Sequence, residues 1–151
     1  MNYYSLNKKS PNVSFQEAVV NGLAPDRGLY FPENINPLSK EFIANIDQYS
    51  NNEIAYEVIK QFVGDEIPKN TLKQIIEETL SFDFPLVSIE ENVATLELFH
   101  GPTMAFKDVG ARFMARCLEH FNKSNTEEVT VLVATSGDTG GAVANGFLSV
   151  K

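Results

Sequence analysis

One lysine of this sequence stands where a helix would place it beside apolar side chains. The segment 100–121 reads HGPTMAFKDVGARFMARCLEHF, and Thr103 has the residue type of a helix N-cap followed by good helix formers. At about 100° per residue, a helix over residues 103–122 places Lys107 in the first turn, at the edge of an apolar stripe. The pattern therefore predicts an amine projecting between Met114 and Leu118.

That position favours a reactive amine. Burial and the positive end of the helix dipole both oppose a positive charge, so both favour the neutral form of Lys107. A neutral lysine amine is suited to Schiff-base formation with an aldehyde such as pyridoxal phosphate. The alternative is that Lys107 extends along its aliphatic stem into solvent. Position alone leaves both interpretations open.

The same helical projection predicts the environment of the lysine. Asp108 and Arg112 are spaced i,i+4 on the opposite face, which we expect to face solvent. Cys117 and His120 are spaced i,i+3, and packing is favoured over a metal site because His100 is the sole further histidine. The apolar face is expected to hold eight residues: Phe106, Val109, Gly110, Phe113, Met114, Cys117, Leu118 and Phe121.

A second candidate site follows an apolar run. Residues 128–134 are expected to form a buried strand, and the loop 135–141, TSGDTGG, leads directly into a helix that begins with the glycines. A small-residue loop between a strand and a helix N-terminus exposes backbone N–H groups to an anion, with hydroxyls and Asp138 adding directed hydrogen bonds. The alternative is a tight connection in which Asp138 or Thr139 only caps the helix.

Other motifs fit this loop poorly. Ser136 lacks the flanking glycines of a nucleophile elbow, and no lysine follows the glycines as in a Walker loop. Asp138-Thr139-Gly140 has the letters of the aspartic-protease triplet. In that family, however, the triplet continues a strand of an all-β fold, whereas here a helix follows. We therefore regard a protease as the weakest of these interpretations.

The elements that position the two segments predict an α/β fold with two domains. Residues 1–84 are expected to form a small, mainly helical domain, and residues 85–151 the first, incomplete part of an α/β domain with strands at 86–89 and 93–99. A turn is predicted at 25–28 and an extended run at 29–31. The helices expected in the first domain are 14–22, with a capping box, 39–46, 52–63, ended by Gly64, and 68–80.

Composition narrows the class of protein. Twelve basic and twenty acidic residues give a net charge of −8, which argues against nucleic acid and an anionic membrane surface as partners. One cysteine, no apolar segment of membrane-spanning length and no signal-peptide pattern predict a cytoplasmic protein.

The final helix stops at residue 151 without a cap or a following strand, so we expect the 151 residues to be part of a longer chain.

Three motifs together resemble one enzyme family. HGPTMAFKD around Lys107, the loop ATSGDTGG and the segment 15–33, FQEAVVNGLAPDRGLYFPE, occur in the order found in threonine synthases. These are pyridoxal-phosphate lyases of the tryptophan-synthase β-subunit fold class, acting in threonine biosynthesis. Arg27 stands where a second glycine is frequent, and Met104 where leucine is common. Neither departure touches the expected chemistry.

The resemblance implies a reaction and a set of site residues. Lys107 would carry the pyridoxal 5'-phosphate Schiff base in an enzyme that converts O-phosphohomoserine and water to threonine and phosphate. Phe106 would help shape the cofactor pocket, and Asp108 would face solvent or a structural partner. Thr103 would either contact the ligand directly or only cap the helix, and the cap is slightly favoured. The loop would receive the substrate carboxylate through four residues: Ser136, Gly137, Asp138 and Thr139. Of these, Asp138 would also be placed toward the cofactor ring.

The resemblance also implies what these residues lack. The family's cofactor-phosphate cup and the partner of the pyridine nitrogen lie further along its chain, so we expect no threonine formation and weak cofactor binding from the 151 residues alone. Two alternatives stay open. One is a threonine-synthase-like phospho-lyase or amino-acid dehydratase of the same fold class. The other is a non-catalytic interaction module. Oligomeric state is not predicted.

Overall fold

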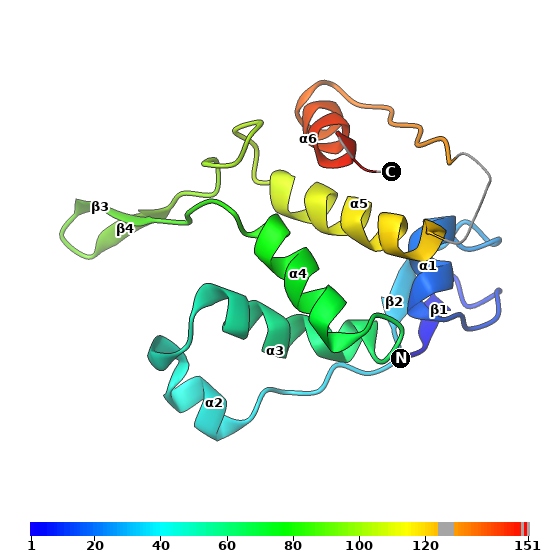
Figure 1. Cartoon of the computed structure of the whole chain (residues 1–151), viewed down its shortest axis with the longest axis horizontal. Coiled ribbons are helices and arrows are strands. Elements are labelled where there is room, and N and C mark those ends of the chain that lie inside the picture. The colour runs from blue at the N-terminus through cyan, green and yellow to red at the C-terminus, as the bar shows by residue number, and fades with distance from the viewer. Residues whose placement is uncertain (124–128, 149, 151) are drawn as a thin grey trace. The chain divides into compact units, whose positions relative to one another are not determined.

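The computed structural model describes residues 1–123, 129–148 and 150, and these form two compact units, Met1–Ile76 and Glu77–Lys151. The described residues contain six α-helices and two small two-stranded sheets, so the fold is mixed α/β (Figure 1). A functional division at residue 84, as expected from the sequence, stays a prediction. No helix in the described part of the chain is long and apolar enough to cross a membrane.

The first unit combines a small sheet with helices. Strand β1 (Tyr3–Ser5) pairs antiparallel with β2 (Tyr30–Pro32), and β2 contains most of the extended run expected at 29–31. The helices are α1 (Phe15–Asn21), α2 (Lys40–Ala44), the 3-10 turn η1 (Ile46–Gln48), α3 (Asn51–Val63) and α4 (Lys69–Thr79). All four helices expected in this region are therefore present.

Local capping explains where two of these helices begin and end. The Ser14 hydroxyl accepts from the backbone N–H of Glu17, whose carboxylate accepts from the Ser14 N–H, which is the predicted capping box of α1. Ser50 and Glu53 form the same box before α3. Gly64, with φ +63°, ends α3, because glycine adopts this left-handed backbone without a Cβ clash.

The core of the first unit includes the end of α3, the connection to α4 and α4 itself. Val63, Ile67 and Leu72 are almost fully buried. The Tyr3 hydroxyl donates to the carbonyl oxygen of Phe62 at 2.7 Å. Burial, together with the nearby Glu66 carboxylate, raises the pKa of Tyr3 to about 12. Tyr3 therefore stays a neutral hydrogen-bond donor throughout the physiological pH range.

The turn predicted at 25–28 is organised by one carboxylate. Asp26 accepts from the Ser5 hydroxyl at 2.6 Å, from the backbone N–H of Lys9 at 2.8 Å and from that of Gly28 at 2.9 Å. The hydrogen bond from Ser5, followed by those from Gly28 and Lys9, lowers the pKa of Asp26 despite partial desolvation. Arg27 has φ +66°, which explains why glycine would suit its position.

This turn predicts a pH-dependent contribution to stability. Because the pKa of Asp26 is lower in the folded than in the unfolded chain, its stabilisation is present above the unfolded value of 3.8 and is lost as pH falls through the folded value. We expect Asp26→Asn to lower the thermal midpoint at pH 7 by roughly a few degrees. Midpoints measured by circular dichroism should converge with wild type in acid. A difference that stays constant down to the acid limit would contradict this assignment.

After the last residues of α4, the second unit contains a hairpin and two further helices. Strands β3 (Leu86–Glu90) and β4 (Val93–Leu96) pair antiparallel around a turn where Asn92 has φ +64°. Helix α5 (Asp108–Asn122) and helix α6 (Asp138–Phe147) follow and pack against one another (Figure 1). The hairpin matches the expected strands, although the second is shorter than predicted.

The strand expected at 128–134 is not present. Residues 129–134 form no strand, and residue 128 lies outside the described residues. Leu132 is 90 % exposed, the opposite of the predicted burial. A strand requires a hydrogen-bonded neighbour, and among the described residues this segment has none. The apolar sequence alone therefore does not create the strand.

Candidate functional site

Lys107 lies directly before α5 rather than inside a helix. The helix expected from Thr103 begins at Asp108, and residues 102–107 form turns. Met104 has φ +55°, a left-handed conformation that no helical residue adopts. The predicted role of Thr103 as the helix N-cap is therefore wrong, and Lys107 itself occupies that position.

Asp108 shows why the chain turns before the helix. Its side chain is 1 % exposed, and its carboxylate accepts the backbone N–H of Thr103 at 2.9 Å and the Thr103 hydroxyl at 2.5 Å. The expected solvent-facing position of Asp108 is wrong, and the alternative of a structural partner is confirmed. Arg112, the expected i,i+4 partner, instead donates to the carbonyl oxygen of Glu78 and to the Ser81 hydroxyl.

The side chains around the lysine differ from the helical projection. Lys107 is half-buried, and its Nζ lies 5.0 Å from the centroid of the Phe106 ring, within the range of a cation–π contact. Phe106 precedes the helix and is 64 % exposed, so it is not part of the buried helical face. In the described part of the chain, no hydrogen bond or ion pair engages the Lys107 amine. The Phe106 ring is therefore the contact that the structure gives for this amine within these residues.

The second candidate site is organised by a residue that the sequence interpretation did not single out. The Thr135 hydroxyl oxygen accepts the backbone N–H of Gly137 at 3.1 Å and that of Gly140 at 3.2 Å. It thereby bonds to the start of α6, and neither Asp138 nor Thr139 provides the cap. The sequence signal that could have identified Thr135 is a threonine two residues before the N-cap glycine, because side-chain hydroxyls commonly accept from the first helical N–H groups.

The loop predicted to bind substrate is open. Ser136, Gly137 and Asp138 are exposed, and Thr139 is half-buried. Gly137 has φ +142°, which favours glycine and fixes the entry of the chain into α6. The hydroxyl and carboxylate groups of this loop are therefore available to a ligand, as the sequence interpretation requires.

Small residues bring the two helices that follow these sites together. A Cβ atom at Gly146 would lie 3.0 Å from the backbone of Ala111, so the last turn of α6 contacts the first turn of α5 directly. Ala115 and Ala142 are fully buried. Arg116 donates to the carbonyl oxygen of Gly146 at 3.0 Å and to the Glu78 carboxylate at 2.7 Å. No hydrogen bond joins Lys107 to the loop 136–139, all of which lies in the described residues.

Cys117 is a packing residue. It is fully buried, and desolvation raises the pKa of its thiol to about 12. The thiol is therefore protonated and unreactive at neutral pH. Within the described ranges, no group of three or more histidine, cysteine, aspartate or glutamate side chains is placed to hold a metal ion.

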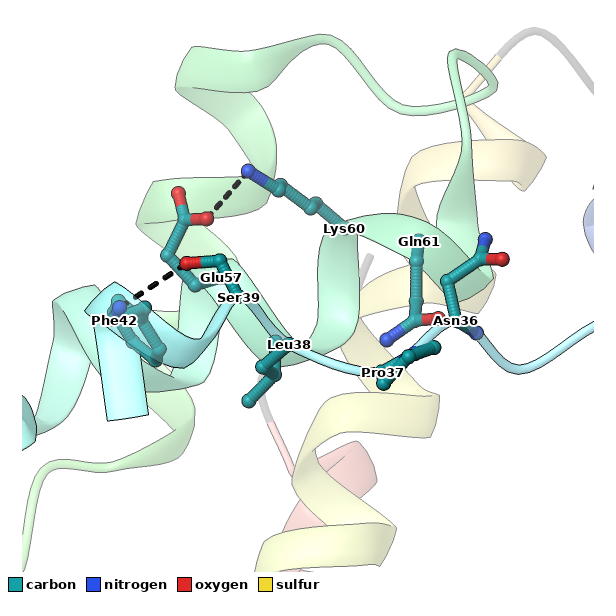
Figure 2. Close-up of a pocket in the computed structure, with 8 residues that line it drawn as sticks. All are labelled: Asn36, Pro37, Leu38, Ser39, Phe42, Glu57, Lys60 and Gln61. Atoms are coloured by element: carbon teal, nitrogen blue, oxygen red, sulfur yellow. Dashed lines mark hydrogen bonds and ion pairs between the residues drawn. The ribbon is translucent and has the colours of Figure 1, made fainter. Parts of the chain in front are cut away.

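The first unit has a shallow hollow of about 220 Å³, which contains none of the predicted site residues. Some of its polar side chains are engaged within the hollow, as Figure 2 shows for the Lys60–Glu57 ion pair and the Ser39 hydroxyl that accepts from the Phe42 N–H. It is lined by eight residues: Asn36, Pro37, Leu38, Ser39, Phe42, Glu57, Lys60 and Gln61.

Comparison with known proteins identifies the family. The family model described as threonine synthase N terminus matches residues 2–80. Threonine synthase of Escherichia coli is 41 % identical over 147 residues, covering 97 % of this chain and 34 % of its own length. That of Buchnera aphidicola subsp. Baizongia pistaciae is 43 % identical over 152 residues, covering 100 % of this chain and 35 % of its own length.

Solved structures agree with the sequence comparison. The crystal structure of threonine synthase from Escherichia coli matches with a TM-score of 0.91 and 40 % identity, over 99 % of this chain and 35 % of that one. The pyridoxal-phosphate-bound threonine synthase from Brucella melitensis matches with a TM-score of 0.93 and 37 % identity, over 100 % and 34 %. The chain thus spans about a third of the length of these relatives. This protein chain belongs to the threonine synthase family and corresponds to its N-terminal region.

Proposed function

We propose that these 151 residues are the N-terminal part of a threonine synthase that converts O-phosphohomoserine and water to threonine and phosphate. The observation that carries this proposal is the Lys107 amine directly before α5, which has no hydrogen-bond or ion-pair partner among the described residues, in a chain whose family is threonine synthase. We call the form that spans the length of its relatives the full-length protein.

The residues present fit a pyridoxal-phosphate site. An amine with no ion-pair partner among the described residues lies beside an aromatic ring, which suits covalent attachment of an aromatic aldehyde. When bound, pyridoxal phosphate supplies an electron sink for chemistry at the substrate carbons. A relative from Brucella melitensis has been solved with this cofactor bound.

Each site residue has a distinct proposed role. Lys107 holds the cofactor covalently and moves protons at the α and β carbons of the substrate. Phe106 lines one side of the cofactor pocket. Asp138 would interact with the cofactor ring. The loop would bind the substrate carboxylate through Ser136, Gly137, Asp138 and Thr139. The exposure of this loop and the Thr135 hydrogen bonds that order it support the assignment.

Covalent labelling tests the proposal. The full-length protein, loaded with pyridoxal phosphate, is treated with borohydride and digested, and the modified peptide is identified by mass spectrometry. We expect one reduced adduct, on Lys107. An adduct on another lysine, or none, would overturn the assignment of Lys107.

Product analysis separates threonine synthase from the related enzymes. Phosphate and threonine are measured together after O-phosphohomoserine is added to the same preparation, and we expect them in equal amounts. Phosphate released without threonine would instead identify a phospho-lyase. The match of residues 2–80 to the threonine synthase N-terminal family supports the first outcome.

A further inference from the structure

A buried carboxylate adjoins the proposed catalytic lysine in sequence and has no role in the chemistry proposed above. Asp108 is 1 % exposed and is the first residue of α5. It does not face solvent with the polar residues of its helix. Its two oxygens accept instead from the N–H and the hydroxyl of one residue, Thr103, five positions earlier. Burying an ionisable group costs free energy, so a buried carboxylate that accepts two such hydrogen bonds indicates a specific role.

These bonds close a short loop, residues 103–108, which we call the lysine loop. Within it, the Met104 N–H donates to the carbonyl oxygen of Gly101 and the Asp108 N–H to that of Ala105, both at 3.0 Å. Its last residue before the helix is Lys107, whose carbonyl oxygen accepts from the Ala111 N–H at 3.0 Å. The loop is therefore fixed by the Asp108 carboxylate at its ends and joined to α5 directly after the lysine.

The atoms around the Asp108 carboxylate restrict the conformation of the lysine loop. A Cβ atom at Gly101 would clash with the Asp108 Oδ2 and would lie 3.0 Å from both the Asp108 Cβ and the Phe82 ring. Met104 keeps a left-handed backbone, φ +55°, which is unfavourable for a residue with a side chain and requires support from surrounding contacts. Gly101, Thr103 and Asp108 thus act together on the segment that carries Lys107.

We propose that Asp108 is a positioning residue: through its two hydrogen bonds to Thr103, it holds the lysine loop so that the Lys107 amine is presented for covalent attachment of the cofactor. The proposal rests on the function proposed for Lys107. It assigns the geometry of the loop to the carboxylate rather than to the helix, which begins only at Asp108.

Two variants of the full-length protein test the carboxylate and its partner separately. Asp108→Asn keeps the shape but replaces one acceptor oxygen with a donor, and Thr103→Val removes only the hydroxyl. We expect each to reduce cofactor affinity, read from borohydride labelling of Lys107 across a cofactor titration, by about tenfold, with a similar fall in kcat and a smaller change in KM. Thr103→Ser, which restores the hydroxyl, should remain within about twofold of wild type.

A matched control separates positioning from general stability. Asp26→Asn alters a carboxylate that also accepts from a hydroxyl and from backbone N–H groups, but in the turn of the first unit. It should lower the thermal midpoint while leaving labelling of Lys107 unchanged. If Asp108→Asn and Thr103→Val lower only the midpoint, with labelling and kcat as in wild type, Asp108 is structural and the proposal is overturned.

Hydrogen exchange distinguishes failure of this proposal from failure of the proposed function. Exchange of amides 104–107 is measured in the full-length protein without cofactor, and we expect it to be faster in both variants than in wild type. Unchanged exchange would overturn the positioning role even if Lys107 is the labelled residue. If Lys107 is not labelled in wild type, the proposed function of Lys107 is rejected, and with it the role of Asp108 in presenting the amine. Faster exchange in the variants would in that case still show that the Asp108–Thr103 contacts hold the lysine loop.

Discussion

Replacing Lys107 with alanine is expected to reduce threonine formation by the full-length protein by about a thousandfold or more, because the substitution removes both the covalent attachment and the group proposed to move protons. The visible absorbance of lysine-bound pyridoxal phosphate should disappear as well. The side chain is half-buried before α5 and makes no hydrogen bond within the described residues, so stability should change little. Coupled measurement of threonine and phosphate, with thermal unfolding of the same samples, checks both parts.

Lys107→Arg is the matched control for charge. It keeps a cation beside the Phe106 ring but has no amine that can attach an aldehyde at neutral pH. We expect it to be as inactive as Lys107→Ala. Substantial threonine formation by either variant would show that another residue carries the cofactor chemistry.

Replacing Leu72 with alanine is expected to cost about 2–5 kcal/mol in the free energy of unfolding, the largest stability effect predicted for the first unit. Leu72 lies in α4 and is only 2 % exposed, so truncation deletes buried contacts and leaves a cavity. Urea unfolding of the 151-residue chain, followed by circular dichroism, measures the change. Because leucine and alanine have similar helix propensities, the loss reports packing rather than helix formation.

Leu23→Ala provides the comparison, since the same atoms are removed from a side chain that is 53 % exposed. Its cost should stay near 0.5 kcal/mol, as for surface substitutions in general. Similar losses for the two variants would mean that Leu72 is not part of the core that stabilises the first unit.

Most of the first unit could be predicted because its signals are local. Ser14 with Glu17 marks the start of α1, and Gly64 marks the end of α3, through interactions between residues no more than four positions apart. Strand β1 was not predicted, because three residues carry too little periodicity. Its pairing with β2 depends on chain segments about thirty residues apart. Non-local pairing of this kind leaves no local pattern.

For the candidate site, the sequence indicated a chemistry, which stays a prediction, but it did not indicate the geometry. Residue types and motif order indicated Lys107 and the loop 136–139. The helical projection then failed before the lysine, because Thr103 and Asp108 are five residues apart and such a pair cannot meet along a helix face. That spacing was the signal that the chain between them must turn. Thr135 was missed for a similar reason, since its two hydrogen bonds exist only once α6 has begun.

The sequence by itself therefore determined the family, the helices of the first unit and the hairpin, because each depends on residue type or on neighbours close in the chain. The assignment of Lys107 as the catalytic amine stays a proposal. Only the tertiary structure decided that Asp108 is buried, that Lys107 precedes α5, and that residues 129–134 form no strand. It also decided that Gly146 lies against Ala111. Burial and strand pairing depend on which distant segments come together, and no local pattern specifies those partners.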